Sequence, residues 1–266
     1  MSRWQLVVTL SGFIVASAAP SALAQGGSTE RDSLVRRATQ GDPRAQYELG
    51  LAHAVGEGQP PDAVVAAQWF RKAAEQGDAA AQYELSTAYA LGLGVPRDPR
   101  EAAEWLRRSA LQGYPDAQYD YALACFQGEG VMKDPEEAAR WLRKAAERGH
   151  LSAQYAYGLA CVHGQGAKMD HTEAARWLRE ASERGDAGAQ HLLGLLYAEG
   201  KGVNPDPVLA YMWLQLAAGR LSGAERDEAV DAQGRVAAGM TPAMIGEAQR
   251  LARDWTPRTG DVSPKP

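Results

Sequence analysis

The sequence predicts an all-α solenoid of antiparallel helix pairs, and three observations support this fold class. The dipeptide Ala-Gln recurs at positions 45, 81, 117, 153 and 189, each time 36 residues after the last. Each interval contains two segments with the apolar spacing of an amphipathic helix. Hydrophobic residues make up 45% of the 266-residue chain, enough for a long continuous core. A fixed period of about 20–50 residues is typical of solenoids, in which each unit buries its apolar face against its neighbours.

The first residues have the pattern of a secretory signal peptide. Arg3 provides a positive start, residues 6–18 are almost wholly apolar, and small residues precede a cleavage site at Ala24. The apolar run is shorter than the ~20 residues that span a bilayer. We therefore expect residues 1–24 to be removed and the mature chain to be periplasmic or secreted. The alternative is an uncleaved anchor.

The rest of the chain divides into terminal segments and repeats. Residues 25–32 are expected to be a flexible entry, and residues 33–44 an N-terminal capping helix. The five predicted repeats are 45–80, 81–116, 117–152, 153–188 and 189–224. We expect two C-terminal capping helices within residues 225–255 and a disordered, Pro/Gly-rich tail over residues 256–266.

Glycines and aspartates mark the helix boundaries of each repeat. The first helix is predicted to end at Gly-x-Gly, as at Gly92 and Gly94, because glycine adopts positive φ without a Cβ clash. This element lacks the Lys-Ser/Thr of a phosphate-binding loop, so helix termination is the better interpretation. The second helix is predicted to begin at an aspartate N-cap, as at Asp98. Pro99 at the first helical position and Glu101, placed as in a capping box, support this start.

Two more columns recur inside the second helix. The first is Trp69, Trp105, Trp141, Trp177 and Trp213. These tryptophans could form a stacking platform for sugars or bases, but an alanine precedes each at constant spacing, which favours core packing. The second column is Arg71, Arg107, Arg143 and Arg179. It resembles an anion-binding edge, but in three cases a glutamate follows four residues later, which favours weak helical ion pairs of ~0.2–0.5 kcal/mol on a solvated face.

The repeat unit is specific enough to indicate a family. Its pattern is Ala-Gln-Tyr-x-Leu-Gly, then Gly-x-Gly-Val, then Asp-Pro-x-x-Ala-x-x-Trp-Leu-Arg-Lys-Ala-Ala-x-x-Gly. This pattern resembles the Sel-one-like repeat, a relative of the tetratricopeptide repeat, over residues 45–224. The final helix, which starts at Thr241, resembles the end cap of that family. The resemblance implies a TPR-like, right-handed α/α superhelix that acts as an adaptor between proteins, without naming a partner.

In such repeats the first helix lines the concave face, so we expect a partner to bind there. The arc opposite the buried Ala-Gln side carries a tyrosine column and, in three repeats, an acidic line. The predicted peptide-binding residues are Tyr47, Glu48, Tyr83, Glu84, Leu91, Tyr119, Asp120, Phe126, Gln127, Tyr155, His163 and Glu199. Tyrosine offers contact area and a hydroxyl, and the carboxylates favour a basic ligand segment. The alternative is that the tyrosines pack helix on helix and the acids are merely solvated.

Few residues are candidates for chemistry. The formal net charge of −5 gives no support for a nucleic-acid partner. Cys125 and Cys161 lie one repeat apart, where stacked helices are ~8–10 Å apart, so two buried free thiols are favoured over a disulfide. Cys161, His163 and His171 lack the paired spacing of metal ligands, so we expect no metal site.

The sequence contains no Ser-x-x-Lys, no Gly-x-Ser-x-Gly and no HExxH motif. We therefore expect a non-catalytic, exported scaffold that binds a protein or peptide. It would need no cofactor, bind no nucleic acid and not insert in a membrane once the signal peptide is cleaved. Some members of the family it resembles have been linked to β-lactams, so the alternative is a cell-wall-associated protein with β-lactam or muropeptide binding or weak hydrolase activity.

Overall fold

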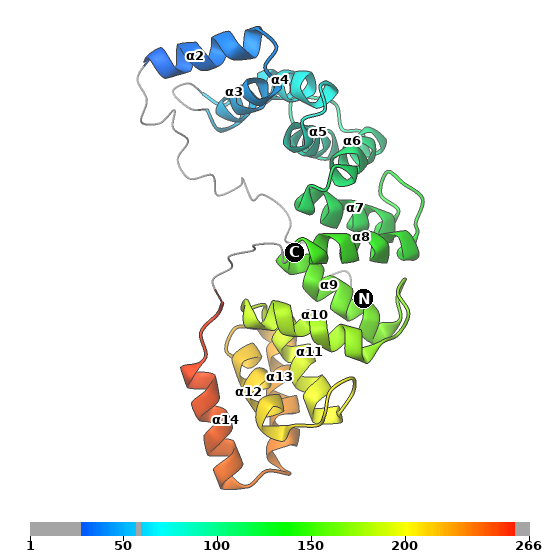
Figure 1. Ribbon diagram of the computed structural model, residues 1–266, viewed down its shortest axis with the longest axis vertical. Helices are drawn as coiled ribbons and strands as arrows, with labels where there is room; N and C mark the ends of the chain where they lie inside the picture. Colours follow the sequence, from blue (N-terminus) through cyan, green and yellow to red (C-terminus); the bar gives the residue numbers. More distant parts are fainter. Residues whose placement is uncertain (1–27, 57–59, 259–266) are drawn as a thin grey trace. The chain divides into compact units, whose positions relative to one another are not determined.

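The structure is a computed structural model that describes residues 28–56 and 60–258. These residues form thirteen α-helices and no strand, which confirms the all-α repeat fold predicted from the sequence. Figure 1 shows these helices coloured in chain order. The chain divides into two compact units, of which unit 1 ends at Lys133 and unit 2 begins at Asp134.

Within each unit, successive helices pack against one another, except that the last helix of unit 2 packs on the helix two before it. The helices of unit 1 are α2 (Ser28–Thr39), α3 (Pro43–Val55), α4 (Ala63–Glu75), α5 (Ala79–Leu91), α6 (Pro99–Leu111) and α7 (Pro115–Gln127). Those of unit 2 are α8 (Pro135–Glu147), α9 (Leu151–His163), α10 (His171–Glu183), α11 (Ala187–Glu199), α12 (Pro207–Ala218), α13 (Gly223–Ala237) and α14 (Pro242–Asp254). The odd-numbered helices from α3 to α11 are the first helices of the five repeats.

The ends of the chain differ from the expected segments. The predicted signal peptide, residues 1–24, lies outside the described residues. Helix α2 begins at Ser28 and so includes part of the segment expected to be a flexible entry. At the other end, residues 256–258 are not a disordered tail. The Arg258 backbone N–H donates to the Glu183 carbonyl (2.7 Å), and the Arg258 guanidinium lies 2.6 Å from the Glu183 carboxylate.

The Ala-Gln dipeptide that marks the repeat joins three helices. The alanine is fully buried, and the glutamine Nε2 donates to a carbonyl eight residues earlier, at the end of the preceding helix. For Gln82 this acceptor is the Ala74 carbonyl (3.1 Å), and Gln82 Oε1 accepts from Gln112 Nε2 (2.8 Å) at the end of α6. The side chain in α5 therefore bridges α4 and α6, which explains why a polar residue recurs in the core.

The predicted helix ends are confirmed, except for the capping box. The Asp170 side chain accepts from the Thr172 and Glu173 backbone N–H groups, as an N-cap does. The Glu173 carboxylate does not return to the cap, because it accepts from Trp177 Nε1 (2.8 Å) instead. The Asp170 backbone N–H donates to the Cys161 carbonyl (3.0 Å), so it needs no glutamate.

From the second repeat on, the second glycine of Gly-x-Gly has a role of its own. Gly166 adopts φ +72°, and a Cβ at this position would lie 1.9 Å from the Pro135 carbonyl oxygen. Gly94 is similar, with 2.0 Å to the Ala63 carbonyl oxygen. The loop therefore crosses the start of the preceding second helix at a distance that only glycine permits.

The tryptophan column belongs to the core. Trp141, Trp177 and Trp213 are each less than 8% exposed. Trp69 and Trp105 are half-buried, and cationic side chains cover their rings: Lys72 Nζ lies 4.0 Å from the Trp69 centroid. These rings are thus occupied by the protein's own side chains, as the core-packing interpretation requires.

Candidate peptide-binding surface

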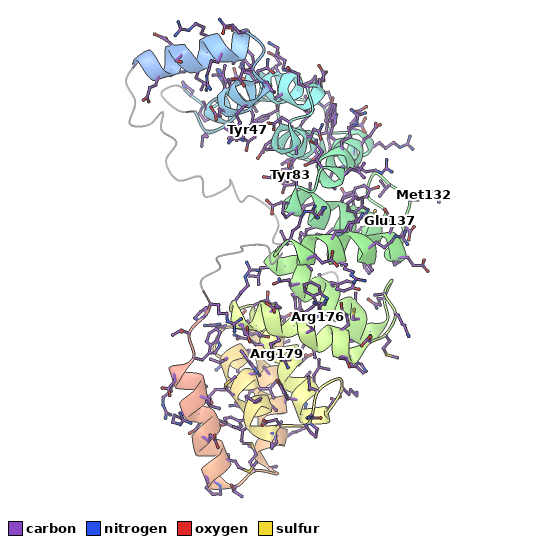
Figure 2. All side chains as sticks on the ribbon, in the orientation of Figure 1. Tyr47, Tyr83, Met132, Glu137, Arg176 and Arg179 are labelled. Atoms are coloured by element: carbon purple, nitrogen blue, oxygen red, sulfur yellow. The ribbon has the colours of Figure 1, made fainter. Side chains whose placement is uncertain are left out.

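The tyrosine column of unit 1 links successive first helices. Figure 2 shows Tyr47 and Tyr83 on the same side of this unit, with Met132 on the opposite side. The Tyr83 hydroxyl of α5 donates to Asp120 Oδ2 of α7 at 2.8 Å. The Tyr83 ring centroid lies 5.3 Å from that of Tyr114, the N-cap residue of α7. Tyr83 thus packs helix on helix and also places a carboxylate.

The other tyrosines of the column also pack against neighbouring side chains. Tyr47 lies against the core cluster around Phe70, with ring centroids 6.1 Å apart, and the Arg44 guanidinium lies 5.2 Å from its ring. Tyr119 is only 5% exposed. In unit 2, the half-buried Tyr155 lies against α11, where a Cβ on Gly188 would be 2.9 Å from the tyrosine ring. The column therefore has a packing role in both units.

The acidic line is not uniform. Glu48 is paired with Arg37 (3.3 Å) and Arg44 (3.2 Å), which neutralise it. Glu84 is half-buried, and its pKa is raised, first by burial and then by the nearby Asp116 carboxylate. Both effects disfavour the charged form of the Glu84 carboxyl group.

These side chains form a cluster that we call the tyrosine–acid surface: Tyr47, Tyr83, Tyr114, Glu84, Asp116 and Asp120. Burial, followed by the Glu84 charge, raises the pKa of Tyr47 to about 12. Burial and the Asp120 carboxylate also raise the pKa of Tyr83. The phenols are therefore uncharged at neutral pH, and the Asp120 carboxylate accepts from the Tyr83 hydroxyl. Such a surface suits a ligand that carries ammonium or guanidinium groups.

Four predicted residues lie apart from this surface. They are the last residues of α5, α7, α9 and α11, namely Leu91, Gln127, His163 and Glu199. Leu91 is eight residues beyond Tyr83, which is ~12 Å along a helix axis. Glu199 is paired with Lys201 (2.6 Å). Phe126 is also at this end of its helix, with Lys133 Nζ 5.7 Å from its ring.

Two members of the surface, Tyr114 and Asp116, were not predicted. The signal was a departure from the repeat in the N-cap column of the first helices, where Tyr114 stands in place of Asp42, Asp78 and Asp186. Tyr114 makes no side-chain capping bond. Its ring packs against Tyr83, a contact that an aspartate at this position could not make.

The other candidates for chemistry are the two cysteine thiols and the possible metal ligands, and the structure gives neither the form of a reactive site. Cys125 and Cys161 are free thiols, each at most 2% exposed. The pKa of the Cys161 thiol is raised by burial. Residues 28–56 and 60–258 contain no cluster of His, Cys, Asp and Glu side chains that could hold a metal ion. Within the same residues, no helix has both the length and the apolar character to cross a membrane.

Comparisons with known proteins show the family of the repeat. The sequence matches the Sel1 repeat family over residues 43–78, 79–114, 115–150, 151–186 and 187–219. The crystal structure of a Sel1 repeat protein from Oxalobacter formigenes is 30% identical, with a TM-score of 0.70, and the match covers 85% of this chain and 93% of that one.

More distant structures show less agreement. A putative Sel1 repeat protein from Klebsiella pneumoniae subsp. pneumoniae is 23% identical, with a TM-score of 0.42, over 77% of this chain and 98% of that one. No curated protein matches the chain significantly. On the repeat match and the Oxalobacter structure, this chain belongs to the Sel1 repeat family, whose members are generally non-enzymatic scaffolds for protein–protein interaction.

Proposed function

We propose that this protein is an exported, non-catalytic scaffold that holds a basic peptide segment on the tyrosine–acid surface of unit 1. The observation that supports this most is Glu84, a half-buried carboxylate whose pKa is raised by burial and by Asp116. Three carboxylates contribute to the surface. The cation that acts on Tyr47 and Tyr114 is Arg44, which is already paired with Glu48.

A lysine or arginine of a ligand would add a positive charge beside these carboxylates. Charge-assisted hydrogen bonds to carboxylates are among the stronger polar contacts. The same cation can lie over a tyrosine ring, as Arg44 does over Tyr47 at 5.2 Å. Since the Tyr83 and Asp120 side chains already hold each other, the surface is ordered before a ligand arrives.

Peptide binding can be tested with two labelled dodecapeptides of the same length, one rich in Lys and Arg and the other with Glu at those positions. Fluorescence anisotropy should show binding of the basic peptide only. The isosteric pair Glu84→Gln and Asp120→Asn should weaken it roughly ten-fold or more, because both acceptor charges are lost.

The matched control is the pair Glu101→Gln and Glu104→Gln, which makes the same charge change on exposed positions of α6. The control should bind like the parent chain. Equal weakening in both variants would mean that bulk charge attracts the peptide and that the surface is not its site. Turnover of nitrocefin by the purified chain would contradict the non-catalytic part of the proposal.

Export has its own test. The proposal rests on Arg3, the apolar residues 6–18 and the cleavage site at Ala24. N-terminal sequencing of the protein from periplasmic and medium fractions should find Gln25 as the first residue. A full-length chain confined to the cytoplasmic fraction would contradict the proposal of export.

A further inference from the structure

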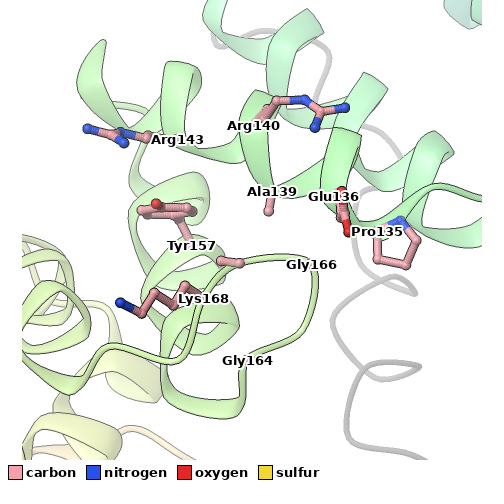
Figure 3. Close-up of a pocket in the computed structure, with 10 residues that line it drawn as sticks. Pro135, Glu136, Ala139, Arg140, Arg143, Tyr157, Gly164, Gly166 and Lys168 are labelled. Carbon is pink, nitrogen blue, oxygen red and sulfur yellow. The ribbon is translucent and has the colours of Figure 1, made fainter.

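Unit 2 contains a cavity of about 640 Å³ that is separate from the tyrosine–acid surface. It lies between the start of α8, one side of α9 and the loop 164–168 that follows α9 (Figure 3). Pro135, Ala139 and the Tyr157 ring give it an apolar lining. A volume of this size is within the range of small-molecule sites, about 300–1,000 Å³.

The charged lining is predominantly positive, and consists of Glu136, Arg140, Arg143 and Lys168. Arg143 donates to Glu147 (2.9 Å), but both side chains are about half exposed, so this pair is weak and can be exchanged. Lys168 forms no ion pair or hydrogen bond within residues 28–56 and 60–258. An anionic group entering the cavity would therefore meet available cationic donors.

The cavity occurs in a register where the second and fifth repeats place the phenol of Tyr89 and Tyr197. In the last repeat pair, Arg179 of α10 donates to the Tyr197 hydroxyl of α11 at 2.9 Å. Arg71 makes the same contact with Tyr89. Arg143 occupies the equivalent position of α8, but the tyrosine it would contact is replaced by Cys161. Arg71 and Arg179 thus donate to a tyrosine hydroxyl, whereas the equivalent Arg143 lines the cavity.

A second small residue enlarges this space. Ala167 of the loop stands at the position where the second, third and fifth repeats carry Val95, Val131 and Val203. The fourth repeat is the one that combines both truncations, Cys161 and Ala167. Tyr157 replaces a leucine one turn before Cys161, and burial raises its pKa to about 12, so its hydroxyl stays protonated. Figure 3 shows the Tyr157 ring between the Arg143 and Lys168 side chains.

We propose that this cavity binds an aromatic carboxylate, either a free small molecule or the C-terminal aromatic residue of a peptide. The ring would pack on Tyr157 and the apolar lining, in place of the phenol that the second and fifth repeats supply. The carboxylate would be held by the Arg143 guanidinium, whose planar donors match it, and by the Lys168 ammonium.

The ligand chemistry is tested with N-acetyl-L-tyrosine and N-acetyl-L-tyrosinamide, which differ only in the charged group. Titration followed by ¹H–¹⁵N NMR should shift the signals of loop 164–168. The acid should bind roughly ten-fold or more tightly than the amide. A short peptide ending in a free Tyr carboxylate distinguishes the sources. Tighter binding of the peptide indicates a chain terminus, and tighter or equal binding of the single residue indicates a small molecule.

A cavity-filling variant tests whether the ligand binds in this cavity. Tyr157→Leu, Cys161→Tyr and Ala167→Val together install the side chains that the last repeat carries at these positions, so the helices keep a compatible set. This variant should lose binding. The matched control is Tyr121→Leu with Cys125→Tyr, which makes the same exchange in the third repeat and should bind like the parent. Lys168→Glu, an exposed charge reversal, is a second variant that does not depend on core packing.

Four results would overturn the proposal. The first three are equal affinity for acid and amide, unchanged binding by both the filled variant and Lys168→Glu, and no binding of the acid up to about 10 mM, far above the affinity of a built site. Loss of binding in the control but not in the filled variant would place the ligand in unit 1 and would also contradict it. The tyrosine–acid surface is untouched by all these variants, so its own test stays independent.

Discussion

At the scale of single residues, Glu84 lowers the stability of the fold while it contributes to the proposed peptide-binding surface. Its carboxylate is half-buried beside Asp116, and both effects raise its pKa. A carboxyl group that ionises less readily in the folded state than in the unfolded state destabilises the fold wherever it is charged. A residue kept in such a position is a candidate for a role outside folding, which is why it supports the proposed peptide surface.

Glu84→Gln should therefore stabilise the fold at pH 7 while it weakens peptide binding. Below about pH 4 both states of the parent chain hold the proton, so the variant gains nothing there. As pH rises through the raised folded-state pKa, the penalty develops in full, and the gain should reach about 0.5–2 kcal/mol. Urea denaturation at several pH values measures this. Glu101→Gln, on the exposed side of α6, should change stability by less than about 0.5 kcal/mol at every pH.

The repeated glutamine gives a second residue-scale prediction, because its partners differ between repeats. Gln82 Oε1 accepts from Gln112, whereas Gln190 Oε1 is buried and has no partner within the described residues. Arg220, which stands at the position of Gln112, lies instead over the Trp255 ring at 4.6 Å. Arg220 therefore contacts Trp255 of the C-terminal segment and does not donate to Gln190 Oε1.

Replacing Gln82 by methionine, a flexible isostere, should therefore cost about 1–3 kcal/mol more than the same change at Gln190. The first variant breaks a bridge between α5 and α6, while the second removes an unpaired buried acceptor. Both keep the size of the side chain. Thermal or urea unfolding of the two variants checks the order, and equal costs would show that the Gln112 bond contributes nothing.

The sequence predicts residue columns well and their partners poorly. The aspartate caps and the buried tryptophans follow from local rules on helix ends and periodicity. The contact between Tyr83 and Asp120 spans 37 residues and depends on how one helix stacks on the next. The pairing of Arg71 and Arg179 with tyrosines, where helical ion pairs with Glu75 and Glu183 were expected, has the same cause.

At the scale of elements, the loop between the two helices of a repeat is defined by two glycines with different duties. The first, such as Gly92, ends the helix in the left-handed region. The second, such as Gly130, lets the loop lie against the preceding helix, because a Cβ there would be 1.9 Å from the Pro99 carbonyl oxygen. The sequence predicts the first duty, since it is local. The second could not be predicted, because the neighbouring helix is 31 residues away in sequence.

Gly130→Ala should consequently cost more than Gly77→Ala, although both residues have positive φ. A Cβ added at Gly77 would have no neighbouring atom within 4 Å, so alanine there adds only the left-handed strain of ~1–2 kcal/mol. At Gly130 the loop must also move off α6, and such displacements add about 1–3 kcal/mol. Free energies of unfolding compare the two, and a smaller cost at Gly130 would show that the loop moves freely.

At the scale of the whole molecule, the contacts indicate how stability is distributed. Most helix–helix contacts lie between successive helices, as between α3 and α4 or α11 and α12. A chain built this way has a stability close to a sum of terms between neighbouring repeats. Damage in one repeat should then remain near that repeat, because distant helices share few contacts with it.

Leu85 and Leu193 allow a direct comparison, since they occupy the same register in units 1 and 2 and both are fully buried. Replacing either by alanine should cost about 2–5 kcal/mol locally. Hydrogen exchange should then show lost protection mainly in α4 to α6 for Leu85→Ala and mainly in α10 to α12 for Leu193→Ala, each the control for the other. A uniform loss over all helices in both variants would instead show that the protein unfolds in a single step. In that case a ligand on the tyrosine–acid surface would stabilise unit 2 as much as unit 1, whereas local unfolding confines its protection to the repeats it contacts.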